Sequence, residues 1–84
     1  MGIDIYKLME IANKEVTQRI GEDKYLDDWI LEDNKFGFRV CRYISPGRVQ
    51  MGDHYIFSYD TEDIFERTAE EQLEAWIDRW FYMN

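Results

Sequence analysis

Hydrophobic residues near the start of the chain recur at steps of three and four, which predicts an amphipathic helix. Asp4 stands where an N-cap side chain would accept hydrogen bonds from the first backbone N–H groups. Gly21 follows the last apolar position and can adopt the left-handed conformation that ends many helices. We therefore expect a helix that begins after Asp4 and ends before Gly21. Its apolar face contains Ile5, Leu8, Met9, Ala12, Val16 and Ile20.

Residues 22–35 permit two interpretations. Four apolar residues in this segment are spaced like one face of a short helix: Tyr25, Leu26, Trp29 and Ile30. The stretch DWILED, residues 28–33, is also typical of a strand that leads into a turn at Asp33 and Asn34. The spacing favours the short helix because the apolar residues do not alternate with polar ones.

Apolar and polar residues alternate over 36–44, which predicts a strand, although Arg42 falls on the apolar face. Pro46 and Gly47 follow it and suit the second and third positions of a type II turn. Two more extended segments, 48–51 and 55–59, are separated by a glycine and an aspartate. We therefore expect three antiparallel strands in sequence order.

The last quarter of the chain contains two signals for the start of a helix. Asp60 can cap a short helix over 61–67, with Tyr59 and Ile64 packing around the cap. Thr68 and Glu71 form a capping box that starts a longer helix over 69–82. The buried stripe of this longer helix is expected to contain Ala69, Leu73, Trp76, Ile77, Trp80 and Phe81.

These elements together predict an α+β fold in a single domain, residues 1–84. It comprises an N-terminal helix, a small three-stranded antiparallel sheet and a C-terminal helical pair packed on one face. Hydrophobic residues make up 45% of the chain, which excludes a disordered class. Cys41 is the only cysteine, so no internal disulfide forms and a reducing compartment is favoured. With neither a signal-peptide pattern nor a membrane-length apolar run, we expect a cytoplasmic protein.

Residue types that carry chemistry are sparse. His54 is the only histidine and Cys41 the only thiol, so we expect no metal site. The five glycines are isolated and form no phosphate-binding loop. Cys41, His54 and Asp53 could serve as nucleophile, base and orienting group, but Cys41 falls mid-strand and the other two suit a turn. We expect a protein that is not an enzyme and needs no cofactor.

The net charge of −8 is unevenly distributed along the chain. Residues 60–84 contain eight acidic and two basic residues, and residues 21–35 contain six and two. Residues 36–59 contain one acidic and three basic residues. Direct binding to nucleic acid or to an anionic membrane requires the opposite sign over a broad face, so neither is expected.

Glu70, Glu74 and Asp78 succeed one another at four-residue steps on the expected last helix. Like charges at this spacing cost about 0.2–0.5 kcal/mol per pair, and only the first turn is offset by the helix dipole. The row is either a solvated surface or a surface complementary to a basic partner. Under the second interpretation the candidate partner-binding residues are Asp27, Asp28, Glu32, Asp33, Asp60, Glu62, Asp63, Glu66, Glu70, Glu71, Glu74 and Asp78.

The charge pattern TEDIFERTAEEQLEAWIDRW, residues 61–80, follows a helix and a short meander in a chain of 84 residues. This layout resembles the small acidic inhibitors encoded by phages, in particular anti-CRISPR proteins, some of which imitate DNA. That group shares no signature sequence, so no residue role is transferred. The resemblance implies a protein that inhibits a nucleic-acid-handling protein, such as a CRISPR nuclease complex, by occupying its basic surface.

Two other classes stay open. An immunity protein or antitoxin against a basic nuclease toxin would use the same electrostatics. A small adaptor or homo-oligomeric subunit would instead use its aromatic residues as the interface and could form a homodimer through them. Tyr82 and its neighbour Met83 are the residues at the end of the helix that are least easily buried. Salt distinguishes these classes, because ionic strength weakens a contact made by charges far more than one made by aromatic rings.

Overall fold

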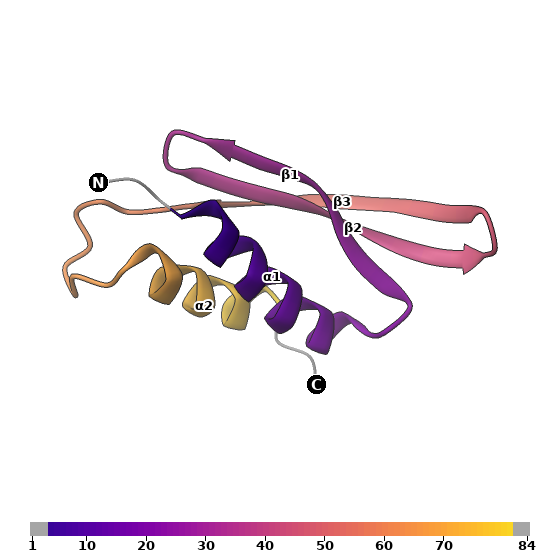
Figure 1. Ribbon diagram of the computed structural model, residues 1–84. Coiled ribbons are helices and arrows are strands. Elements are labelled where there is room, and N and C mark those ends of the chain that lie inside the picture. Colours follow the sequence, from indigo (N-terminus) through magenta and orange to yellow (C-terminus); the bar gives the residue numbers. More distant parts are fainter. Residues whose placement is uncertain (1–3, 82–84) are drawn as a thin grey trace.

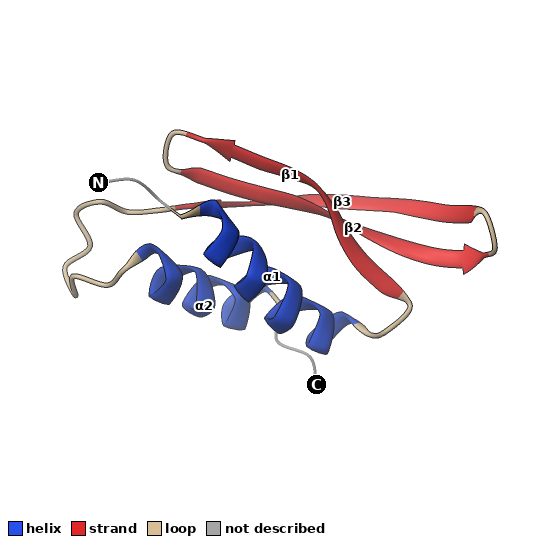
Figure 2. Cartoon of the chain, viewed as in Figure 1, coloured by secondary structure: helices blue, strands red, loops and turns tan. Residues whose placement is uncertain are grey.

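The computed structural model describes residues 4–81 and consists of two helices and one sheet (Figure 1). The elements are α1 (Ile5–Ile20), β1 (Lys24–Glu32), β2 (Lys35–Ser45), β3 (Arg48–Ser58) and α2 (Ala69–Trp80). The strands form an antiparallel sheet in the order β1-β2-β3. Both helices lie on the same side of this sheet (Figure 2). The predicted α+β class and the number of strands are confirmed.

Both ends of α1 and the start of α2 are where the sequence placed them, whereas α2 ends at Trp80 and not at the predicted position 82. The Asp4 carboxylate accepts hydrogen bonds from the backbone N–H groups of Tyr6 and Lys7, and Gly21 ends α1 with a φ of 106°. At the start of α2, Thr68 and Glu71 form the expected capping box. These signals act within one turn of the helix, so they require no knowledge of the rest of the fold.

The short helix expected over 61–67 is absent, and the prediction of a C-terminal helical pair is therefore wrong. Residues 59–68 instead run as a loop with two turns. The Asp60 carboxylate accepts a hydrogen bond from the backbone N–H of Glu62, which closes a turn rather than a helix. Glu66 adopts a φ of 52°, and this left-handed conformation interrupts any continuation into α2.

The short helix favoured over residues 25–30 is also wrong, because this segment is strand β1. The register with β2 shifts between Asp27 and Ile30, and Asp28 adopts a φ of 54° within the bulge. A bulge adds a residue to one strand and moves the later side chains to the other face. Leu26 is consequently buried in the core and Trp29, three residues on, packs against it.

Strand β3 joins the two extended segments that the sequence separated at Gly52 and Asp53. The register with β2 shifts at this point, between the pair Arg39–His54 and the pair Cys41–Met51. Gly52 lies so close to the Val40 carbonyl oxygen that a Cβ atom there would overlap it. The glycine therefore permits a bulge within a continuous strand, whereas the sequence pattern suggested a break.

The core lies between the helices and the sheet, and Phe38 is at its centre. The Phe38 side chain is completely buried, and its ring centroid lies 6.1 Å from that of Trp76 and 6.0 Å from that of Phe81. In the stripe predicted to be buried, Trp80 is 60% exposed and Trp76 is partly buried, while the other four residues are buried as expected: Ala69, Leu73, Ile77 and Phe81. One polar residue of α2 that does not belong to the predicted stripe, Gln72, is also buried.

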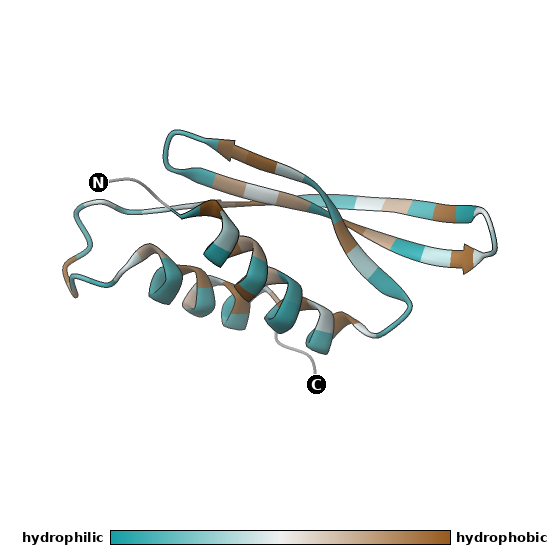
Figure 3. Ribbon diagram, viewed as in Figure 1, coloured by the Kyte–Doolittle hydropathy of each residue, from teal (hydrophilic) through white to brown (hydrophobic). Residues whose placement is uncertain are grey.

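The β2–β3 hairpin extends beyond the helices, and it carries hydrophobic positions near its tip (Figure 3). The tip is the predicted turn at Pro46 and Gly47, where Gly47 adopts a φ of 76°. The overall dimensions of 45 × 28 × 18 Å reflect this extension. Within residues 4–81, neither helix has the length and apolar character needed to cross a membrane.

Candidate functional site

Two acidic segments meet at the end of the molecule opposite the hairpin tip. The backbone N–H of Tyr59 donates to the carbonyl oxygen of Asn34 at 2.7 Å, and the Asn34 side-chain amide donates to the Tyr59 carbonyl at 2.8 Å. Asn34 belongs to the β1–β2 turn and Tyr59 begins the loop before α2. These bonds bring Glu32 and Asp33 close to the loop that contains Asp60.

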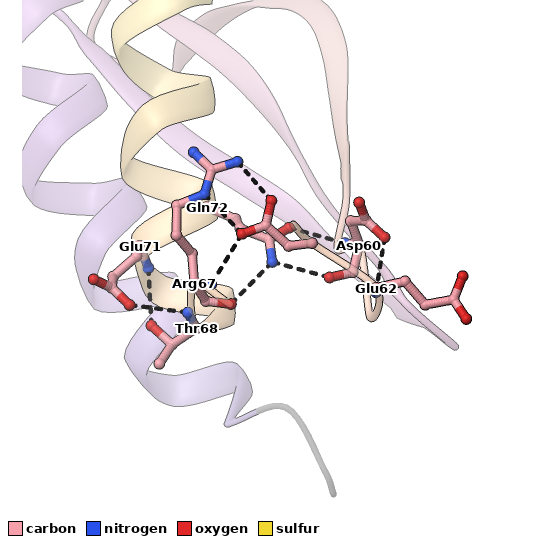
Figure 4. A network of polar contacts seen from close by, with 7 residues as sticks. Asp60, Glu62, Arg67, Thr68, Glu71 and Gln72 are labelled. Atoms are coloured by element: carbon pink, nitrogen blue, oxygen red, sulfur yellow. Dashed lines mark hydrogen bonds and ion pairs between the residues drawn. The ribbon is translucent and has the colours of Figure 1, made fainter. Parts of the chain in front are cut away.

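The loop 59–68 is fixed to α2 by the buried side chain of Gln72 (Figure 4). The Gln72 amide oxygen accepts a hydrogen bond from the Asp60 backbone N–H at 2.9 Å. The Gln72 amide nitrogen donates to the carbonyl oxygens of Asp60, at 3.0 Å, and Arg67, at 3.1 Å. One side chain thus holds both ends of the loop and places its acidic residues beside the first turn of α2.

The Asp63 carboxylate forms hydrogen bonds inside this loop. Its carboxylate accepts two hydrogen bonds from the Arg67 guanidinium, at 2.9 and 3.0 Å, and one from the Arg67 backbone N–H at 2.9 Å. The guanidinium hydrogen bonds, together with the backbone bond, lower the pKa of Asp63 to about 2. Its side chain is only 8% exposed, so Asp63 orders the loop and presents little charge to a partner.

Glu71 has a similar local role. Its carboxylate accepts a hydrogen bond from the Thr68 backbone N–H at 2.9 Å, and its own N–H donates to the Thr68 hydroxyl at 3.2 Å. The backbone hydrogen bond from Thr68 is the largest cause that lowers the pKa of the Glu71 carboxyl. Glu71 therefore stays ionised at the start of α2, but part of its carboxylate is engaged in the cap.

The acidic row of α2 is partly neutralised by α1. Asp78, the last residue of the row, forms an ion pair with Arg19, whose guanidinium also contacts Glu15 at 3.0 Å. The sequence could not indicate this pair because the two residues are 59 positions apart. Glu74, one turn before Asp78, is exposed.

Asp27 and Asp28 lie on the sheet, away from the loop. The Asp28 carboxylate lies 2.8 Å from His54 Nε2 and 3.6 Å from the Arg39 guanidinium. Asp27 is exposed and pairs with Arg39 in the register of the sheet. His54 therefore contacts Asp28 rather than Cys41, which is buried with its sulfur 3.6 Å from that of Met51.

Several carboxylates of this region form no ion pair within the part of the chain that the structure describes. We call this set the acidic end, and it comprises Glu32, Asp33, Asp60, Glu62, Glu66 and Glu70. Glu74 extends it by one turn along α2. Across residues 4–81, no group of three or more histidine, cysteine, aspartate or glutamate side chains is arranged to hold a metal ion.

The sequence interpretation missed two apolar residues in the same loop. Ile64 was expected to pack against Tyr59, but it is 85% exposed, and Phe65 is 71% exposed. The Arg67 guanidinium lies 5.5 Å from the centre of the Phe65 ring. The sequence signal that could have indicated their exposure is the position of two adjacent bulky apolar residues between acidic ones. The aromatic-end candidates Tyr82 and Met83 lie outside the described residues.

The amino-acid sequence matches no protein-family model and no curated protein, and the fold matches no solved structure. The candidate site is therefore defined by its geometry and charge alone.

Proposed function

We propose that this chain is a non-enzymatic acidic binding protein that inhibits a nucleic-acid-handling protein, such as a CRISPR nuclease complex. The acidic end would occupy the basic surface on which the target binds nucleic acid. The observation that carries the proposal is the gathering of unpaired carboxylates from the β1–β2 turn, the loop 59–68 and α2 at one end. The hydrogen bonds of Asn34 and Gln72 create this arrangement.

Fixed placement of the carboxylates supports binding rather than mere solubility. A flexible acidic tail loses conformational entropy when it binds, whereas a loop already held at both ends by Gln72 loses less. Negative charge gathered in one place accelerates the encounter with a basic surface and opposes acidic partners. It also competes directly with the phosphate groups of a nucleic acid for the same lysine and arginine side chains.

A pair of charge-reversal variants tests the proposal. The first, Glu62→Lys/Glu74→Lys, alters the acidic end and leaves every side-chain hydrogen bond of the loop in place. The matched control, Glu10→Lys/Glu22→Lys, changes the net charge equally at exposed positions elsewhere. Asp78 is left unchanged, because a lysine there would face Arg19.

Partners are captured from nuclease-treated extract of the native host and eluted in steps of rising salt. We expect to capture a nucleic-acid enzyme that moderate salt or duplex DNA releases from the wild-type chain. The same enzyme should bind the control variant and should not bind the first variant. The purified enzyme should then bind its nucleic acid at least tenfold more weakly in the presence of the wild-type chain. A partner that resists high salt and binds both variants equally contradicts the proposal.

A further inference from the structure

The tip of the β2–β3 hairpin is an exposed apolar surface. Residues 43–49 line an open concavity of about 610 Å³. Tyr43 and Ile44 are 57% and 55% exposed although they belong to strand β2, whose register with β3 shifts at this point. The Tyr43 ring centroid lies 4.6 Å from that of Tyr25. A hairpin that served only the core would carry polar residues here, so these side chains indicate a contact surface.

The charge of the tip is positive. Arg42 and Arg48 are the only charged residues between positions 42 and 51. Arg42 is paired with Asp23 at 3.0 Å, whereas Arg48 forms no ion pair within residues 4–81. An occupant of the concavity should therefore combine apolar side chains with negative charge.

The loop at the acidic end has these two properties. Ile64 and Phe65 are its most exposed apolar side chains, and the loop contains four acidic residues and one basic residue, Arg67. Arg67 is paired with Asp63, so the charge left to the loop is that of Asp60, Glu62 and Glu66. Hydrogen bonds from Gln72 and within the Asp63–Arg67 pair hold the loop in place, so its apolar side chains are presented at little entropic cost. Figure 1 shows this loop and the hairpin tip at opposite ends of the molecule.

We propose that the chain associates head to tail, with Ile64 and Phe65 of one copy seated on the hairpin tip of the next. Charge decides between this arrangement and a symmetric one, because two hairpin tips placed together would bring Arg48 next to Arg48. A contact between opposite ends of the molecule leaves one free end on each copy of a dimer, so it builds open chains, or rings where the rotation between copies closes, rather than symmetric dimers. The proposal requires only the chain itself and does not depend on the proposed function.

The surfaces involved are small, so association is weak. Stable interfaces bury about 1,200–2,000 Å², and a loop of ten residues on a hairpin tip stays below that range. We expect a monomer at about 10 μM and a weight-average mass that passes the dimer at about 1 mM in low salt. Added NaCl should weaken the contact, since part of it is made by opposite charges.

Complementation between two variants gives the decisive test. The loop variant, Ile64→Ser/Phe65→Ser, keeps an intact tip, and the tip variant, Ile44→Ser/Arg48→Glu, keeps an intact loop. Sedimentation equilibrium should show each variant alone as a monomer at 1 mM and their mixture as a one-to-one heterodimer. The control Tyr6→Ser/Trp80→Ser removes two exposed apolar side chains elsewhere and should associate like the wild type. Circular dichroism first verifies that each variant is folded.

Three results would overturn the proposal. The first is a wild-type chain that stays monomeric at 1 mM. The second is a loop variant that associates as strongly as the wild type, which indicates a symmetric contact through the hairpin tips. The third is a mixture of two monomeric variants that forms no heterodimer. Because no nucleic acid or partner protein is present, failure here is distinguishable from failure of the proposed function.

Discussion

The side chain of Gln72 pairs with the backbone of Asp60 as a neighbouring strand would, accepting from its N–H and donating to its carbonyl. Gln72 is the buried polar residue of α2, with 7% of its surface exposed. Its third hydrogen bond, to the Arg67 carbonyl, satisfies the far side of the loop. The conformation of the acidic loop thus depends on one amide in the core rather than on a helix of its own.

Replacing Gln72 by Leu should lower the free energy of unfolding by about 1–3 kcal/mol, because three partly buried hydrogen bonds that hold the loop are lost. Urea denaturation followed by circular dichroism measures the loss. Gln18→Leu is the matched control, since Gln18 is exposed on α1 and should tolerate the change. Equal stability of the two variants would show that water replaces the amide without cost.

Asp63 should make stability depend on acid pH. Its pKa is lowered from 3.8 to about 2 in the folded protein, chiefly by hydrogen bonds from the Arg67 guanidinium. A carboxyl with a lowered folded-state pKa stabilises the fold fully above its unfolded pKa and loses this contribution as pH falls through the folded value. The melting temperature of Asp63→Asn should therefore lie below that of the wild type at pH 6, and the difference should shrink between about pH 4 and pH 2.

The corresponding control is Glu62→Gln, which removes a neighbouring exposed charge that has no ion pair within the described residues. Its melting temperature should follow that of the wild type across the same pH range. A difference between wild type and Asp63→Asn that stays constant down to pH 2 would mean that the Arg67 pair contributes nothing to acid sensitivity.

Phe38 should be essential for folding. The side chain is fully buried among other aromatic rings, and truncation of such a residue to alanine costs about 3–5 kcal/mol. The net free energy of unfolding of so small a domain is about 3–5 kcal/mol. Circular dichroism should therefore show Phe38→Ala to be largely unfolded at 25 °C. Phe65→Ala, an exposed position with a cation–π contact, should change the stability by no more than about 1 kcal/mol.

Local signals explain which elements could be predicted from the sequence. The caps at Asp4, Gly21 and Thr68 act on neighbouring backbone groups, and they correctly define both ends of α1 and the start of α2. In β1 the pairing with β2 decides the structure. Its bulge separates Leu26 from Trp29 by three residues on one face, which imitates the period of a helix.

The candidate site, too, could be predicted only in part from the sequence. The sequence shows that the acidic residues are concentrated, but not which of them already have partners. Arg19 reaches Asp78 from another helix, and His54 reaches Asp28 from another strand. Such pairs are set by tertiary packing, so the chemistry of the surface follows only from the fold.

Gly52 should be the residue of β3 least tolerant of a side chain. A Cβ atom there would overlap the backbone carbonyl of Val40, and backbone in the middle of a sheet cannot move aside as a flexible side chain can. Gly52→Ala should lower the free energy of unfolding by about 1–3 kcal/mol, the usual cost of overpacking. Urea denaturation measures the loss, and amide hydrogen exchange should show it concentrated in β2 and β3.

Gly47→Asn is the control, because Gly47 has a positive φ that asparagine tolerates and no atom lies within 4 Å of its Cβ position. It should cost less than about 1 kcal/mol. The bulge at Gly52 also sets the direction of the hairpin tip beyond it. If Gly52→Ala folds with unchanged stability, the register of β3 can shift to accommodate the methyl group, and the prediction is wrong. The direction of the hairpin tip would then also differ, so head-to-tail association should be measured for Gly52→Ala as well.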